Sequence, residues 1–199
     1  MIKSIIGYGG FAREVYWSIY DTEGVKSVFF VDDEWYNPYE DNVLPLSIFE
    51  PEKYEVVVCI GDSYSRKKVV DRLPENTKYF THIHRSVKIL GNDVKIGTGS
   101  VICAGCILTT NIELGAHTHL NLQTTVGHDT NTGSYFTTAP GVNISGNVSV
   151  GDLVYIGSNA SIKQKIKICD NVTIGMNSCV VKNIEESGVY IGTPSYKIK

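Results

Sequence analysis

The sequence predicts two units: a small α/β domain of the Rossmann-like type over residues 1–81, followed by a parallel β-helix built from hexapeptide repeats over residues 82–199. Short apolar runs in the first unit alternate with glycine turns and helical segments. From Ile96 to Val180 an aliphatic residue returns at nearly every sixth position, and glycine often follows it directly. A period of six fits neither an α-helix nor an alternating strand, and it is typical of β-helix repeats.

The first unit is interpreted as a small parallel sheet. Apolar runs predict strands at residues 3–6, 28–31 and 55–60, and helical patterns follow the first and the third of them. Ligands of such sheets bind at the carboxyl ends of the strands. Glycine or acidic clusters fall at all three ends: Gly7–Gly10, Asp32–Asp33 and Gly61–Asp62.

These clusters favour a nucleotide as the ligand. Glycines let backbone N–H groups approach a phosphate at the start of a helix, and a carboxylate about twenty residues further on is where a Rossmann-like site binds ribose. A glycine run alone can equally make only a tight turn between a strand and a helix. About 80 residues are too few for a full dinucleotide fold, so we expect a single nucleotide, free or carrying a cargo.

In the second unit, the aliphatic position of each hexapeptide is expected to point into the rod and stack on its own copies. Two positions, Thr132 and Thr138, break this rule just after a polar run that contains His128. Departures from a strict pattern often mark functional sites. His128 and the adjacent Asp129 are therefore candidate functional residues, although a solvated surface histidine is the ordinary alternative.

Four further histidines are present. His82 and His84 fall at the boundary of the two units, where we interpret them as linker or packing residues, and His117 and His119 share one hexapeptide. The five cysteines suggest free thiols, and the Cys103–Cys106 pair lacks the second CxxC pair that a zinc site of this type needs. No bound metal is expected.

Composition excludes several classes of partner. The net charge of −3 and the lack of a basic run argue against nucleic-acid binding. No apolar run approaches the length that spans a membrane, and Ile2–Ile6 is too short for the core of an export signal. The expected compartment is the cytoplasm.

Taken in order along the chain, these motifs resemble the bacterial nucleotide-sugar N-acetyltransferases that acetylate 4-amino-4,6-dideoxy sugars, and their relatives the sialic acid O-acetyltransferases. The resemblance covers nearly the whole chain. It is carried by the following segments: Gly7–Gly10, Phe30–Asp33, Ile60–Asp62 with Arg66, Val126–Asp129 and Tyr190–Pro194.

The resemblance implies a left-handed β-helix that assembles as a homotrimer, with acetyl-CoA in the groove between two rods. It implies His128 as the general base, Asp129 as the carboxylate that makes it more basic, and the Gly146 N–H as the oxyanion donor. The positions implied for acetyl-CoA are Thr137, Gly146, Ser158 and Met176. Those implied for a UDP-linked sugar are Gly10, Phe11, Ala12, Asp32, Asp33 and Gly61.

One position departs from the family pattern, because Thr137 stands where several relatives have a second histidine near the acetyl group.

Three other functions remain open. Acetyl transfer to a hydroxyl of a sialic acid or another sugar is the first. A zinc hydrolase of the kind found among β-helix carbonic anhydrases is the second, since His117, His119 and His128 could supply ligands. A non-catalytic nucleotide-sugar-binding scaffold is the third.

Overall fold

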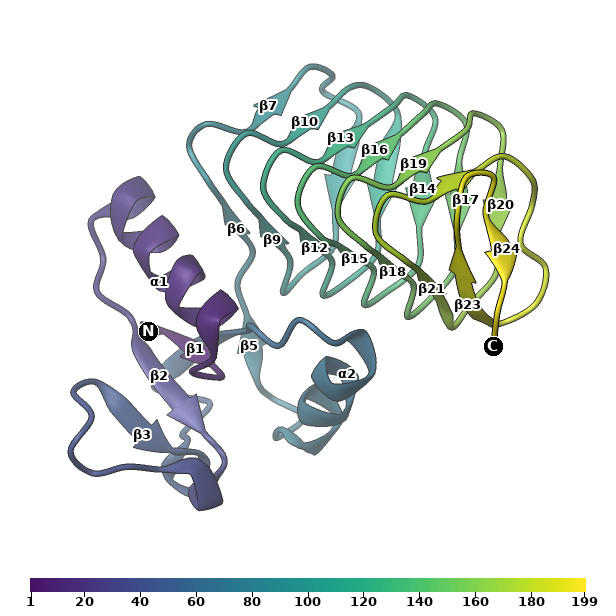
Figure 1. Ribbon diagram of the computed structural model, residues 1–199. Coiled ribbons are helices and arrows are strands. Elements are labelled where there is room, and N and C mark those ends of the chain that lie inside the picture. The colour runs from purple at the N-terminus through teal and green to yellow at the C-terminus, as the bar shows by residue number, and fades with distance from the viewer.

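The structure is a computed structural model that describes residues 1–199 and consists of an α/β domain joined to a β-helix (Figure 1). This architecture confirms the fold class predicted from the sequence. The N-terminal domain contains a parallel sheet with the strand order β3-β2-β1-β4-β5. Its strands are β1 (Ile2–Ile6), β2 (Val28–Val31), β3 (Val43–Pro45), β4 (Tyr54–Val58) and β5 (Lys78–Tyr79). The short strands β3 and β5 were not predicted, because three and two residues are too few to show a period.

Two helices cover opposite faces of this sheet. Helix α1 (Gly10–Glu23) buries Ala12, Val15 and Ile19, which share one face at helical spacing, and it ends at Gly24 in the left-handed conformation. Helix α2 (Ser63–Arg72) begins where the Asp62 carboxylate accepts a hydrogen bond from the Ser65 N–H, at 2.8 Å. The chain also forms two short 3₁₀ turns, η1 (Asp33–Trp35) and η2 (Leu46–Ile48). Neither helix is long and apolar enough to cross a membrane.

The β-helix has three parallel sheets, in which partner residues such as Leu120, Thr138 and Ile156 are 18 positions apart. One sheet comprises β7 (Lys88–Ile89), β10 (Ile107–Leu108), β13 (Thr125–Val126), β16 (Asn143–Ile144), β19 (Ser161–Ile162) and β22 (Cys179–Val180). The second comprises β8 (Val94–Ile96), β11 (Ile112–Leu114), β14 (Asn131–Thr132), β17 (Ser149–Val150) and β20 (Lys167–Ile168). The third comprises β6 (His82–Ile83), β9 (Val101–Ile102), β12 (His119–Leu120), β15 (Thr137–Thr138), β18 (Tyr155–Ile156), β21 (Val172–Ile174), β23 (Gly188–Ile191) and the antiparallel β24 (Tyr196–Lys197). We call these the six-, five- and eight-stranded sheets.

The aliphatic positions form one continuous buried cluster along the rod, as their period predicts. The two threonines that interrupt the period also point inward. Thr138 Oγ1 lies 2.8 Å from Thr124 Oγ1 and accepts a hydrogen bond from the Asn121 N–H, while Thr132 Oγ1 accepts one from the Gly115 N–H. Both hydroxyls are satisfied within the rod, so these interruptions are compatible with the core.

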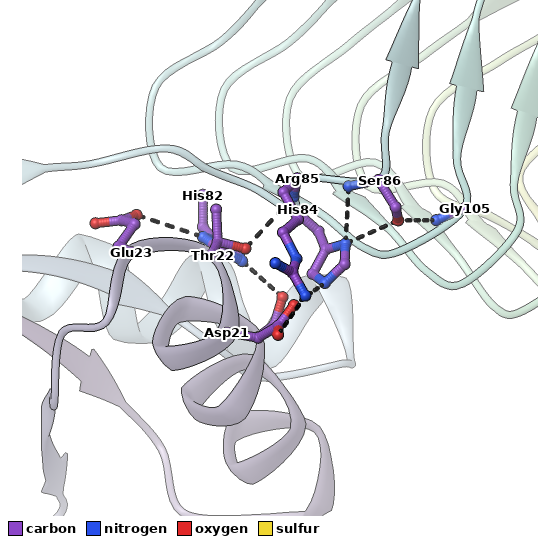
Figure 2. Close-up of polar contacts among 9 residues, drawn as sticks. Asp21, Thr22, Glu23, His82, His84, Arg85, Ser86 and Gly105 are labelled. Carbon is purple, nitrogen blue, oxygen red and sulfur yellow. Dashed lines mark hydrogen bonds and ion pairs between the residues drawn. The ribbon is translucent and has the colours of Figure 1, made fainter.

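The two units share an apolar core and a polar seam. Val101 and Cys103 of the β-helix pack in the same cluster as Ile5 and Ala12 of the N-terminal domain. Figure 2 shows the polar seam at the end of α1, where Asp21 contacts both His84 (3.1 Å) and Arg85 (2.9 Å).

The two boundary histidines are thereby placed as packing residues. His82 is buried with its Nε2 2.7 Å from Ser18 Oγ on α1, and His84 bonds Ser86 through its Nδ1 at 2.8 Å. Burial lowers the pKa of His82 to about 4, so at neutral pH its ring is uncharged.

Arg66 on α2 is buried completely at the same junction. Its guanidinium donates to the carbonyls of Ile60 (2.7 Å), His117 (3.1 Å) and Tyr135 (3.0 Å) and to Thr137 Oγ1 (2.7 Å). Loss of hydration lowers its pKa to about 10, which still leaves the group charged at neutral pH. Arg66 therefore fixes the loop after β4 to the turns of the β-helix.

Candidate functional site

A cavity of about 420 Å³ opens at the carboxyl ends of the strands of the N-terminal domain. Gly7, Tyr8 and Gly9 line it after β1, and Asp32 and Trp35 line it after β2. Its floor is apolar and comes from Ile6, Phe30, Val31, Ile60 and Val69. A flat aromatic base fits such a floor, and the polar groups at the rim can bind a sugar or phosphate.

The start of α1 lies beside this cavity and has no side-chain cap on its first N–H groups. Uncapped N–H groups at a helix start form a favourable site for a phosphate. A Cβ placed on Gly10 would meet no atom within 4 Å, so the space in front of this turn is open.

The two predicted acidic residues have different surroundings. Asp32 lines the cavity, and its carboxylate is paired with Arg72 at 3.0 Å. The carboxylate of Asp33 instead accepts a hydrogen bond from the Ser47 N–H, at 3.0 Å. Ala12, on the inward face of α1, is fully buried in the core. Of these three residues, only Asp32 is on the cavity surface.

A second cavity, of about 230 Å³, lies between the N-terminal domain and the eight-stranded sheet. It brings together Phe11 and Gly61, which were predicted to bind the nucleotide sugar, with Thr137 and Ser158, which were predicted to bind acetyl-CoA. His119 also lines it. Residues from the two units and more than 140 positions apart thus form one junction cavity.

The Thr137 hydroxyl already forms hydrogen bonds within the chain at this cavity. Its hydroxyl receives a hydrogen bond from Arg66 at 2.7 Å and lies 3.0 Å from Ser63 Oγ. Thr137, which stands where several proteins of the resembled family have a second histidine, therefore helps to hold the two units together.

His128 lies elsewhere, on the turn of residues 127–130 that joins the six-stranded to the five-stranded sheet. Its Nδ1 is 2.6 Å from Asp129 Oδ2 of the same chain. Asp129 has a φ of 58°, and this left-handed turn directs its carboxylate back to its neighbour. With Nδ1 bonded to a carboxylate, Nε2 is the nitrogen left to accept a proton.

Gly146 lies on the equivalent turn one coil further on and directly beneath the imidazole. A Cβ added at Gly146 would lie 2.5 Å from His128 Nε2, so only glycine admits the ring here. The Gly146 N–H forms no hydrogen bond within the chain, which leaves it free to donate to a ligand beside Nε2.

A second hydrogen bond holds the Asp129 carboxylate in place. The Asn111 side chain donates a hydrogen bond to Asp129 Oδ1 at 2.6 Å, so each carboxylate oxygen has one partner. The Asn111 amide, and after it His128, hold the pKa of Asp129 below its usual range. The sequence did not single out Asn111, because this contact joins turns 18 residues apart.

Replacing Asn111 with glycine is expected to lower the rate of any reaction that uses His128 as a base by roughly three- to tenfold, the equivalent of one lost hydrogen bond. Without the amide donor, the pKa of Asp129 rises and its carboxylate is lost earlier as the pH falls, so the deficit widens toward acidic pH. Glycine keeps the left-handed turn (φ 50°). The check is kcat measured from neutral to acidic pH, and a deficit that stays constant with pH contradicts this role.

Asn171→Gly is the matched control, since Asn171 has a φ of 57° on another edge of the rod. It is expected to leave the pH profile unchanged.

The predicted site residues thus form separate groups within one chain. His128, Asp129 and Gly146 lie on turns that follow strands of the six-stranded sheet, whereas Ser158 and Met176 lie on turns that precede such strands. Met176 is 72% exposed. The three histidines of the zinc hypothesis do not come together, and no group of three or more potential metal ligands is formed.

Sequence reasoning missed other residues of the site. Tyr8 and Trp35 line the first cavity, and the available signal was an aromatic residue just after each strand end. His119 was noticed only as a possible zinc ligand. Its ring instead packs against Phe11, with ring centroids 5.1 Å apart.

Comparison with known proteins gives consistent matches. The model of the PglD N-terminal domain family matches residues 4–73. A GDP-perosamine N-acetyltransferase of Escherichia coli O157:H7 is 35% identical over 115 residues, which are 58% of this chain and 52% of that protein. The chain spans between 29% and 52% of the lengths of the curated relatives it matches.

Two solved structures resemble the whole chain. WeeI from Acinetobacter baumannii AYE is 28% identical, with a TM-score of 0.88 and complete coverage of both chains. PerB from Caulobacter crescentus, in complex with CoA and GDP-perosamine, is 24% identical with a TM-score of 0.89, covering 100% of this chain and 98% of that one. Residues 4–73 therefore match the PglD N-terminal domain family, and the whole chain has the fold of these two structures.

Proposed function

We propose that the chain transfers an acetyl group from acetyl-CoA to the 4-amino group of a nucleotide-linked 4-amino-4,6-dideoxy sugar, with His128 as the general base. The observation that carries this proposal is the arrangement at His128. Asp129 occupies Nδ1, Nε2 is free, and an unpaired Gly146 N–H lies beside it. This arrangement supplies both a proton acceptor and an oxyanion donor for attack on a thioester.

In the proposed reaction the amine attacks the thioester carbonyl carbon and forms a carbon–nitrogen bond. The negative charge that develops on the carbonyl oxygen is stabilised by the Gly146 N–H. His128 Nε2 takes the excess proton from the nitrogen. Collapse of the tetrahedral intermediate breaks the carbon–sulfur bond, and the proton passes to the departing thiolate of CoA. The five free cysteines take no part in these reaction steps.

The site is complete only between subunits. The turns that precede the six-stranded sheet carry Ser158 and Met176, and those that follow it carry His128 and Gly146. Six residues of extended chain separate the two edges of this sheet, a span of up to about 20 Å. If three rods meet with this sheet facing a common axis, the following turns of one subunit lie against the preceding turns of the next.

The character of the three faces supports this homotrimer. The eight-stranded sheet faces the N-terminal domain (Figure 1). The five-stranded sheet presents the charged Lys95, Glu113 and Lys167. The six-stranded sheet presents one charged side chain, Lys88 in its first strand, and otherwise uncharged ones: Ile107, Thr125, Asn143, Ser161 and Cys179. Such side chains permit close approach of identical subunits about a symmetry axis.

The nucleotide part of the acceptor, the nucleotide sugar, is proposed to occupy the first cavity. Its base lies on the apolar floor, its ribose is held by Asp32, and its phosphates lie before α1 at Gly10. The sequence resemblance favours UDP, whereas the E. coli relative and the PerB structure carry GDP-perosamine in their names. The sugar extends toward Phe11 and Gly61 in the junction cavity.

A mass-spectrometric assay tests the proposal. Acetyl-CoA is incubated with GDP-perosamine, the UDP- and dTDP-linked 4-amino-4,6-dideoxy sugars and free sialic acid. We expect one amino sugar to gain an acetyl mass. The matched nucleotide sugars with a hydroxyl at carbon 4 are expected to gain none, and an acetylated sialic acid would favour O-acetylation instead.

Thermal unfolding separates the enzyme from a scaffold. An enzyme is stabilised both by its nucleotide sugar and by CoA, whereas a scaffold responds to the nucleotide sugar alone. Stabilisation by nucleotide sugar without any response to CoA, together with no acetylated product, would contradict the proposed function.

A further inference from the structure

His119 stands apart from the other histidines of the chain. Its side chain is 1% exposed, and neither ring nitrogen has a hydrogen-bond partner. His82, His84 and His128 each have at least one hydrogen-bonded partner, although His82 Nδ1 has none, and His117 has one nitrogen that is both buried and unpartnered, its Nδ1. The Val58 carbonyl lies near the ring and acts to raise the pKa of His119, but its position does not meet the geometry of a hydrogen bond. Buried polar groups are normally paired, so a wholly unpaired imidazole requires an explanation.

The position of His119 offers an explanation for its unpaired ring. It lies in β12, on the outward side of the eight-stranded sheet, in register with Thr137 in the adjacent strand β15. It lines the junction cavity together with Phe11 and Gly61 from the nucleotide-binding side and Ser158 from the β-helix. An unpaired imidazole is therefore placed between the two regions to which the proposed function assigns the sugar and acetyl-CoA.

The charge state of this ring restricts what it can bind. Burial, and after it Arg66 and His117, hold the pKa of His119 well below its usual range, so the ring is neutral near pH 7. A neutral imidazole offers one N–H donor and one acceptor nitrogen. Arg66 is the buried cation beside the ring, and its guanidinium is already bonded to five acceptors. The cavity therefore suits an uncharged group that both donates and accepts, as a sugar hydroxyl does.

We infer that His119 is a specificity-determining residue whose imidazole hydrogen-bonds a hydroxyl of the acceptor sugar. This inference rests on the proposed function for the class of its ligand. Phe11 packs against the imidazole and is only partly buried. A rotation of this side chain opens the ring to the cavity when the sugar enters.

Calorimetric titration tests this inference without acetyl-CoA. The probes are GDP and GDP-perosamine, and in parallel UDP and its 4-amino-4,6-dideoxy sugar conjugate. In His119→Leu the dissociation constant of the bound nucleotide sugar is expected to rise about tenfold, while that of its nucleoside diphosphate changes by less than about twofold. His119→Gln keeps a neutral donor and acceptor, and it is expected to recover part of the loss.

His117→Asn is the matched control. His117 is also buried, but its ring stacks on Tyr135 and does not line the cavity, and its φ of 55° suits asparagine. The affinities of the His117→Asn variant for the nucleotide sugar and for its nucleoside diphosphate are expected to match those of the wild type. Thermal unfolding of each variant verifies the fold, and His119→Gln carries the test if the leucine variant does not fold.

The outcomes separate this inference from the proposed function. An unchanged affinity for the nucleotide sugar in the His119 variants, or an equal loss for the sugar nucleotide and its diphosphate, makes His119 a packing residue and overturns the inference. The inference is also overturned if the wild-type chain binds the nucleotide sugar no more tightly than the nucleoside diphosphate. A chain that shows the expected loss but acetylates nothing overturns the proposed function alone.

Discussion

Replacing His128 with alanine is expected to lower kcat by about 10²–10⁴-fold, the usual contribution of a general base. The dissociation constant of acetyl-CoA is expected to change by less than about twofold, because the imidazole acts on the amine in the transition state. The structural reason is that Asp129 occupies Nδ1 at 2.6 Å and leaves Nε2 above Gly146. Steady-state kinetics and a titration with acetyl-CoA measure the two quantities.

Asn92→Ala is the matched control for this substitution. Asn92 occupies the same turn position as His128 two coils earlier and is exposed, so its loss is expected to leave kcat unchanged. If the His128 variant keeps more than about a tenth of the wild-type kcat, the principal base lies elsewhere.

Two inactive variants are expected to restore activity when they are combined in one trimer. His128→Ala removes the base from the turn after the six-stranded sheet. Gly10→Asp places a carboxylate where the phosphates are proposed to bind, in open space that admits the new side chain. If each site takes its base from one subunit and its nucleotide sugar from the next, random mixing gives one intact site in four, or about a quarter of the wild-type activity.

The measurement is acetyl transfer after the two variants are unfolded together and refolded at equal concentration. Each variant refolded alone is the control and is expected to stay inactive. A mixture that remains inactive, although mixed trimers are shown by mass spectrometry to have formed, places both halves of the site in one chain and contradicts the shared site.

The β-helix could be predicted from the sequence because its information is local. Each hexapeptide carries its own inward aliphatic residue, and the partners 18 positions away repeat the same pattern. The edge of the N-terminal sheet could be predicted for the same reason, since glycines and acids directly follow the apolar runs. The short strands β3 and β5 could not, because their pairing depends on the sheet already being formed.

The candidate site was predicted only in part. The pairing of His128 with Asp129 depends on a left-handed backbone at Asp129, which the adjacency of the two residues does not by itself specify. The engagement of Thr137 by Arg66 and the binding of Asp33 to Ser47 depend on how separate segments dock. Side-chain propensities do not encode such contacts.

The sequence by itself determined the periodic rod, the glycine-rich turn before α1 and the identity of the histidine with an adjacent acid, because each is written in residues that are close neighbours along the chain. The tertiary structure alone decided that His119 lies unpaired in the junction cavity, that Asn111 holds Asp129, and that the predicted residues divide between two edges of the six-stranded sheet. These relations arise when distant turns stack and two units dock, since hydrogen bonding and burial depend on distances in space.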